Sequence, residues 1–372
     1  MKDTQISKKR IDSLQALRSL AFLGIFFFHA NFFIGWPELG VSIFYVMSGF
    51  LMTYRYENVE LPTTPKKCLG FSLNKIKKLY PLHIITMICA IVLSVIDIVS
   101  NGFSTRSIVL LVGEIVLNIT LLQTWVPHRN INASLNGVAW YLSVTMFLYF
   151  VFPWIKKIIE KSSIRKLIII SGLIIITEIL TCIPFIKALG ANSSIYIWFM
   201  YCFPVFRLGD FFIGCVLKRA FFEYNMNSIG VTKATIYEVL VTAMTVFVIL
   251  WFKQDCSNTF LLALHNWTTI FVPLAAIWVL LFAANKGLLT KILSNRLTIF
   301  VGNISAFVFL IHYVITRYTS FLLSVFDINI EGWGRILLVF AELVVSIALS
   351  VLYKSFQDNY ISKYFFQKSK ES

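Results

Sequence analysis

The sequence has 372 residues, of which 58% are hydrophobic and only 14% are charged. A soluble domain carries roughly 25% charged residues, so this composition excludes a soluble enzyme and a disordered chain and indicates a membrane protein. The net charge of +15 is spread over short stretches between apolar runs. That pattern favours basic cytoplasmic loops, and we expect no nucleic-acid partner.

Eleven apolar segments are candidates for membrane spans, each of which takes about 20 residues as a helix. The longest polar stretch between them, residues 57–78, is a loop marked by Pro62 and Pro65. We therefore expect an all-α bundle of transmembrane helices that forms one domain over residues 1–372. The candidate segments are residues 14–34, 39–56, 79–99, 107–125, 138–155, 166–187, 196–217, 235–252, 268–284, 298–320 and 336–355.

Basic residues set the expected orientation. With the N-terminus in the cytoplasm, eleven spans would place the five basic residues of the stretch 156–166 outside, against the positive-inside rule. The segment 107–125 is the most polar of the set and carries Glu114, Asn118 and Gln123. We therefore expect it to be re-entrant or interfacial, which leaves about ten spans and puts both termini in the cytoplasm.

The first apolar segment contains two ionisable residues. Arg18 and His29 are eleven residues apart, close to three helical turns, so they share one face at a separation of about 16 Å. An arginine near a helix end can reach lipid phosphate, and a buried histidine can simply bond a neighbouring helix. Ionisable side chains inside a span are nevertheless candidates for function, because burying them in lipid is costly.

These two residues open a pattern that resembles the acyltransferase-3 family of integral-membrane acyltransferases. The family begins with a Leu-x-x-Leu-Arg segment followed by a histidine, matched here by Leu14, Leu17, Arg18 and His29. Its second helix is similar to residues 40–51. The sequence is identified on these segments as a member of the family.

Further segments similar to the family follow in the same order along the chain. Thr145 and Ser42 depart from the pattern, since many members have Glu and Asp there, and no carboxylate role is carried over to them. The matching residues are Lys75, Lys77 and Lys78 in the basic segment before the third helix, Trp140 to Val144 with Tyr149 and Pro153, Arg207, Asp210, Phe211 and Gly214, and Gly302, Ser305, Leu310 and His312.

The resemblance implies an O-acyltransferase that moves an acyl group, most often acetyl, from acetyl-CoA to a hydroxyl of a cell-surface polysaccharide or its lipid-linked precursor. It also implies a multi-pass protein of the bacterial plasma membrane, surrounded by membrane lipid. Acyl-CoA would be a substrate, and we expect no permanently bound cofactor and no metal. Larger relatives add an extracellular esterase-like domain, which we do not expect here because the chain ends soon after residue 355.

The expected chemistry assigns roles to the matched residues. A neutral imidazole, with an ordinary pKa of about 6.5, can take the hydroxyl proton, and a guanidinium binds phosphate through two nitrogens. We expect His29 to be catalytic, as a base or as an acylated intermediate, and Arg18 to bind acyl-CoA together with Lys75, Lys77 and Lys78. The expected supporting or substrate-contact residues are Ser48, Trp140, Arg207, Asp210, Ser305 and His312.

Several of these residues have a purely structural interpretation as well. Arg207 and Asp210 are three residues apart and can form an ion pair inside the bundle, and His312 can be a polar contact between helices.

Two other functions also fit the composition. A transporter of a glycan or small anion would use the same buried His, Arg and Asp, although the sequence has no repeated half or paired broken helices. A scaffold for a polysaccharide synthase would not need His29.

Overall fold

The computed structural model describes residues 10–32, 36–252, 258–264 and 268–361, and within these ranges every regular element is a helix. The bounds follow. The longer helices are α1 (Asp12–His29), α2 (Pro37–Arg55), α3 (Pro65–Ile76), α4 (Tyr80–Ser100), α5 (Thr105–Thr120), α7 (Trp140–Lys161), α8 (Ile164–Leu189), α10 (Leu208–Glu223), α11 (Val231–Phe252), α13 (Phe271–Ala284), α15 (Arg296–Val325) and α16 (Gly332–Phe356). The short elements are η1 (Gln123–Trp125), α6 (Arg129–Asn132), η2 (Gly137–Ala139), α9 (Ser194–Ile197), η3 (Trp198–Cys202), η4 (Met226–Ser228), α12 (Thr259–Leu264), α14 (Leu288–Leu293) and η5 (Gln357–Ile361).

The expected all-α, multi-span class is confirmed. Within the described ranges, six helices are long and apolar enough to cross a membrane. The other candidate segments form shorter, more polar or broken helices, so the count of about ten spans and the cytoplasmic termini stay predictions. The six are Tyr80–Ser100, Gly137–Lys161, Ile164–Leu189, Val231–Trp251, Arg296–Val325 and Gly332–Asn359.

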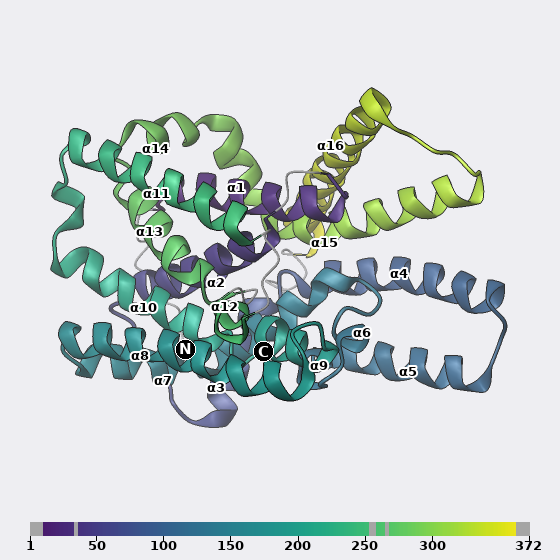
Figure 1. The fold of residues 1–372 in the computed structure, drawn as a ribbon, viewed down its shortest axis with the longest axis horizontal. Coiled ribbons are helices and arrows are strands. Elements are labelled where there is room, and N and C mark those ends of the chain that lie inside the picture. The colour runs from purple at the N-terminus through teal and green to yellow at the C-terminus, as the bar shows by residue number, and fades with distance from the viewer. Residues whose placement is uncertain (1–9, 33–35, 253–257, 265–267, 362–372) are drawn as a thin grey trace.

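Two predicted segments are interrupted. In the segment 107–125, α5 ends at Thr120 because Leu121 adopts a left-handed conformation with φ of 56°. The 16 residues of α5 are fewer than the roughly 20 of a full span, and α5 returns alongside α4 (Figure 1). In the segment 196–217, the π-helical turn η3 ends before Pro204, which has no N–H to continue a helix, and α10 begins only at Leu208.

Helices α1 and α2 run through the middle of the molecule (Figure 1). The hairpins α4–α5 and α15–α16 extend to one side, and α8, α10, α11, α13 and α14 lie on the other. The central helices meet their neighbours backbone to backbone at glycines. A side chain at Gly302 of α15 would overlap the Gln15 carbonyl of α1, and one at Gly214 of α10 would overlap the Val46 carbonyl of α2. Such small-residue contacts are typical of membrane helix pairs.

Candidate active site

A cavity of about 240 Å³ lies between α1, α2, α3, α7 and α15, and we call it the Arg18 cavity. Four residues that the sequence predicted for the site line it together: Arg18, Ser48, Lys75 and Ser305. They come from four different helices. The rest of the wall is mostly aromatic or apolar and includes Phe44, Tyr141, Leu142, Thr145, Tyr149, Phe309 and Leu310.

Arg18 supplies a positive charge to this cavity without a matching negative one. Among the described residues, its guanidinium donates one hydrogen bond, of 3.3 Å, to the amide oxygen of the neutral Gln15 side chain. No carboxylate of the described residues lies within ion-pair distance of it. A charge that is partly removed from water and unpaired is costly, so the arrangement favours binding of an anion in the cavity.

Lys75 adds a second cation to the cavity because α3 is held against α7. The Ser72 hydroxyl of α3 donates to the Met146 carbonyl of α7 at 2.5 Å, and the rings of Phe71 and Phe152 stack with centroids 6.2 Å apart. The Lys75 amine bonds the Tyr56 hydroxyl. Lys75 therefore lies at the cavity as one of two cations.

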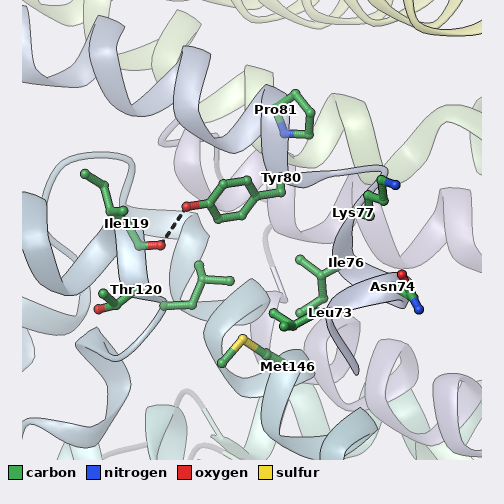
Figure 2. Close-up of a pocket in the computed structure, with 10 residues that line it drawn as sticks. Leu73, Asn74, Ile76, Lys77, Tyr80, Pro81, Ile119, Thr120 and Met146 are labelled. Carbon is green, nitrogen blue, oxygen red and sulfur yellow. Dashed lines mark hydrogen bonds between the residues drawn. The ribbon is translucent and has the colours of Figure 1, made fainter. Parts of the chain in front are cut away.

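The other two lysines of the basic segment are not in this cavity. Lys77 and Lys78 are exposed, and Lys77 lines a separate hollow of about 530 Å³ formed by the ends of α3, α4 and α5 with α7. The Tyr80 hydroxyl donates to the Ile119 carbonyl across this hollow at 2.8 Å, with Lys77 on the opposite side (Figure 2). The expected acyl-CoA contacts of Lys77 and Lys78 remain predictions that the cavity geometry does not support.

A stripe of hydroxyl groups on α7 completes the polar wall of the Arg18 cavity. Tyr141, Thr145 and Tyr149 all line the cavity, and the Tyr149 and Ser48 hydroxyls are 3.1 Å apart. None of these three residues was predicted for the site, although Tyr141 and Tyr149 lie in a segment that matches the family. Their spacing of four residues was the available signal, because it places them on one face of a helix.

His29 and His312, which lie 283 residues apart, are in direct contact. The His29 Nδ1 and His312 Nε2 atoms are 3.0 Å apart, and the His312 side chain is completely buried. Phe309 belongs to the wall of the Arg18 cavity, and its ring centroid lies 5.7 Å from that of His312. The histidine pair therefore stands directly behind one wall of the cavity.

Trp140, Arg207 and Asp210 form a different region. The Tyr45 ring stacks on the ring of the cavity residue Tyr141, with centroids 4.7 Å apart. It also contacts the Trp140 ring, at a centroid distance of 6.4 Å, and the Arg207 guanidinium carbon lies 4.8 Å from the Tyr45 ring centroid. Arg207 and Asp210 form an ion pair at 2.9 Å with side chains only 0% and 1% exposed. These three residues do not line the Arg18 cavity, so direct substrate contact is not supported by the geometry.

Glu178 of α8 adds a second carboxyl group to that region. It interacts electrostatically with both Arg207 and Asp210, and it accepts a hydrogen bond from the Thr269 hydroxyl at 3.2 Å. The sequence placed Glu178 inside an apolar segment but could not assign it a partner. No group of three or more His, Cys, Asp or Glu side chains that could hold a metal ion occurs in the described part of the chain.

Comparison with known proteins matches almost the whole chain to one family. The acyltransferase domain of the acyltransferase-3 family matches residues 11–354. The chain is 27% identical to the acyltransferase MdmB of Streptomyces mycarofaciens over 233 residues, covering 56% of this chain and 57% of that protein. It is 22% identical to the peptidoglycan O-acetyltransferase OatA of Listeria monocytogenes, covering 92% of this chain and 55% of the relative.

A third relative is the O-acetyltransferase OatA of Staphylococcus aureus, 22% identical, with 84% of this chain and 52% of the relative covered. The chain thus spans about half the length of these relatives. No solved structure matches it. Since the family match extends from α1 to α16 and includes every residue of the Arg18 cavity and the histidine pair, the chain belongs to the acyltransferase-3 family of acyltransferases.

Proposed function

We propose that this protein transfers an acetyl group from acetyl-CoA to a hydroxyl of a cell-surface polysaccharide or of its lipid-linked precursor. The names of two relatives, a peptidoglycan O-acetyltransferase and an O-acetyltransferase, support the group transferred and the class of acceptor. The six apolar helices make it a multi-pass membrane protein. We assign it to the plasma membrane of a bacterium, in keeping with the bacterial sources of those relatives.

The observation that carries this proposal is the unpaired Arg18 guanidinium in a cavity whose wall backs onto the histidine pair. Coenzyme A is a polyanion joined to its reactive thioester by a narrow chain. Arg18 and Lys75 would hold its phosphate groups, and the mainly apolar remainder of the cavity suits the chain. Arg18 and His29 are about 16 Å apart along their helix, which is of the same order as the extended arm of the donor.

The proposed reaction needs one proton transfer in each direction. The His29 imidazole takes the proton of the acceptor hydroxyl, and the oxygen attacks the thioester carbonyl carbon. The new C–O bond forms and the C–S bond breaks. The departing thiolate then takes the proton back from the imidazolium, so that the products are an O-acetyl ester and free CoA and no other reactant is consumed.

The direct test is thiol release by the purified protein in detergent, with acetyl-CoA and a hydroxyl acceptor derived from the surface glycan. We expect free CoA and ester-linked acetyl in equal amounts, and mass spectrometry of the glycan from cells with and without the chain should show the same acetyl groups. Acetylated glycan that persists at the same level in cells lacking the chain would contradict the assigned acceptor.

The buried charges around α10 favour a second candidate, transport of a glycan or small anion. The helix break before Leu208 and the enclosed Arg207–Asp210 pair with Glu178 are features seen at transport sites. The sequence has no repeated half in which this break could have a counterpart. A transporter would not consume the thioester, so the thiol-release assay also separates the two functions.

A further inference from the structure

The two histidines belong to a chain of hydrogen bonds that begins at a backbone carbonyl. His312 Nδ1 lies 3.2 Å from the Val308 carbonyl oxygen, one turn earlier on α15. His312 Nε2 lies 3.0 Å from His29 Nδ1. The Nε2 atom of His29 has no hydrogen-bond partner among the residues that the structure describes, and the His29 side chain is only half-buried.

This geometry fixes where the protons are. A carbonyl oxygen can only accept, so His312 Nδ1 must carry the hydrogen that it donates to Val308. In a neutral imidazole the other nitrogen is then an acceptor, so His312 Nε2 accepts from His29 Nδ1. His29 consequently carries its hydrogen on Nδ1, and its Nε2 keeps a free lone pair.

The surroundings of His312 support the neutral form. Its ring is enclosed by Phe22, Phe26 and Phe309, with centroid distances of 5.4, 6.0 and 5.7 Å. No carboxylate of the described residues pairs with it, so a second proton would place an unpaired charge among aromatic rings. The same contacts hold the His312 ring in one orientation, and His29 is further fixed by the Tyr313 ring at 5.1 Å.

We propose that His312 is a positioning residue that holds His29 in the Nδ1–H tautomer, so that His29 Nε2 is the atom that takes the proton of the acceptor hydroxyl. This inference rests on the proposed function for the identity of the reaction. The tautomer itself follows from the two hydrogen bonds and the neutral form of His312, and it does not depend on the reaction. In other enzymes a histidine base is held in the required tautomer by an acidic partner, and here a second histidine anchored to a carbonyl does that task.

The tautomer can be measured without any activity. The chain has five histidines, so nitrogen NMR of protein labelled with ¹⁵N-histidine gives a tractable spectrum, and His29→Gln identifies the His29 signals. We expect the wild-type His29 Nε2 signal to be that of a nitrogen without hydrogen. A His29 signal with hydrogen on Nε2 in the wild type would overturn the proposal.

Substitutions at 312 separate positioning from packing. In His312→Gln the amide oxygen can occupy the place of Nε2 and accept from His29 Nδ1, whereas in His312→Asn the amide lies near the place of Nδ1 and cannot reach His29. We expect kcat to fall about tenfold to a hundredfold in His312→Asn and to recover to within a few-fold of wild type in His312→Gln. The KM for acetyl-CoA should change less than twofold in both variants. Equal losses in the two variants would contradict positioning.

The matched control is His83→Gln, which changes another fully buried histidine; His83 bonds the Asn118 carbonyl at 3.0 Å and does not line the Arg18 cavity. It should leave the His29 spectrum and kcat unchanged.

The outcomes also separate this inference from the proposed function. If the Nδ1–H tautomer is found but no thiol is released, the function fails and the tautomer stands. If transfer occurs but the tautomer is absent, only the role of His312 fails.

Discussion

Two arginines with opposite surroundings, the partly buried Arg18 and the fully buried Arg207, lie on either side of the aromatic pair Tyr45 and Tyr141. Arg18 faces a cavity, and in the described part of the chain its one side-chain hydrogen bond goes to the neutral Gln15. Arg207 is completely buried, pairs with Asp210 at 2.9 Å and has a second carboxyl group nearby in Glu178. Helix α2 contributes to both regions, since Ser48 lines the Arg18 cavity and Tyr45 covers Arg207.

The difference shows which of the two guanidinium charges is available for a ligand. A guanidinium that already has its carboxylate gains little from another anion, and losing that carboxylate would leave it unpaired. A guanidinium beside a cavity and without a carboxylate gains its partner only when an anion enters. We therefore expect substitutions around Arg18 to lower the rate of transfer or the affinity for the donor. Substitutions around Arg207 should instead lower the stability of the fold.

The largest expected effect is that of His29→Ala, which removes the proposed base. Transfer should fall by about 10²-fold to 10⁴-fold, the usual contribution of a general base. The half-buried side chain is not a major packing element, so size-exclusion elution and thermal unfolding in detergent should match the wild type. Glycan acetylated at the wild-type level in this variant would remove His29 from the mechanism.

The opposite response is expected from Arg207→Ala. Removing the guanidinium leaves Asp210 and Glu178 buried without a cation, and breaking such a pair costs about 3–5 kcal/mol. The thermal midpoint in detergent should fall markedly, whereas the KM for acetyl-CoA of the folded fraction should stay near the wild-type value. A stable protein with a raised KM would mean that Arg207 contacts the donor.

Lysine substitutions at the two arginines sharpen the comparison. Lysine keeps the charge but cannot bind phosphate through two nitrogens, so Arg18→Lys should raise the KM for acetyl-CoA about tenfold with a smaller loss in kcat. Arg207→Lys keeps a point charge beside Asp210 and should leave that KM unchanged. If both variants leave the donor KM unchanged, Arg18 is not a donor-binding residue and its contact with lipid phosphate is the better explanation.

The smallest effects on transfer are expected at the glycine contacts of the two regions. Gly302→Ala separates α15 from Gln15 of α1, and Gly214→Ala separates α10 from Val46 of α2. Each should destabilise the protein by about 1–3 kcal/mol, the usual cost of overpacking. Only Gly302→Ala should also lower kcat, because α1 and α15 carry the two histidines. Equal kcat losses in both variants, measured at matched amounts of folded protein, would contradict this division.

The sequence alone determined the helical class, the position of most helices and the family. Long apolar runs must satisfy their backbone hydrogen bonds internally, so composition and length suffice to predict helices in a membrane protein. The same local logic placed Arg18 and His29 on one face. Hydropathy predicted one continuous helix over the segment 196–217, and this was wrong, because a π-helical turn and Pro204 divide the segment.

Only the tertiary structure decided which of the matched residues act together. Arg18 and Arg207 look alike in sequence, since both are single arginines in apolar segments, and what separates them is the presence of a carboxylate at one and a cavity at the other. The pairing of His29 with His312 joins residues 283 positions apart. Hydrogen bonds and charges act over a few ångströms in space, and the distance along the chain carries no information about them until the helices have packed.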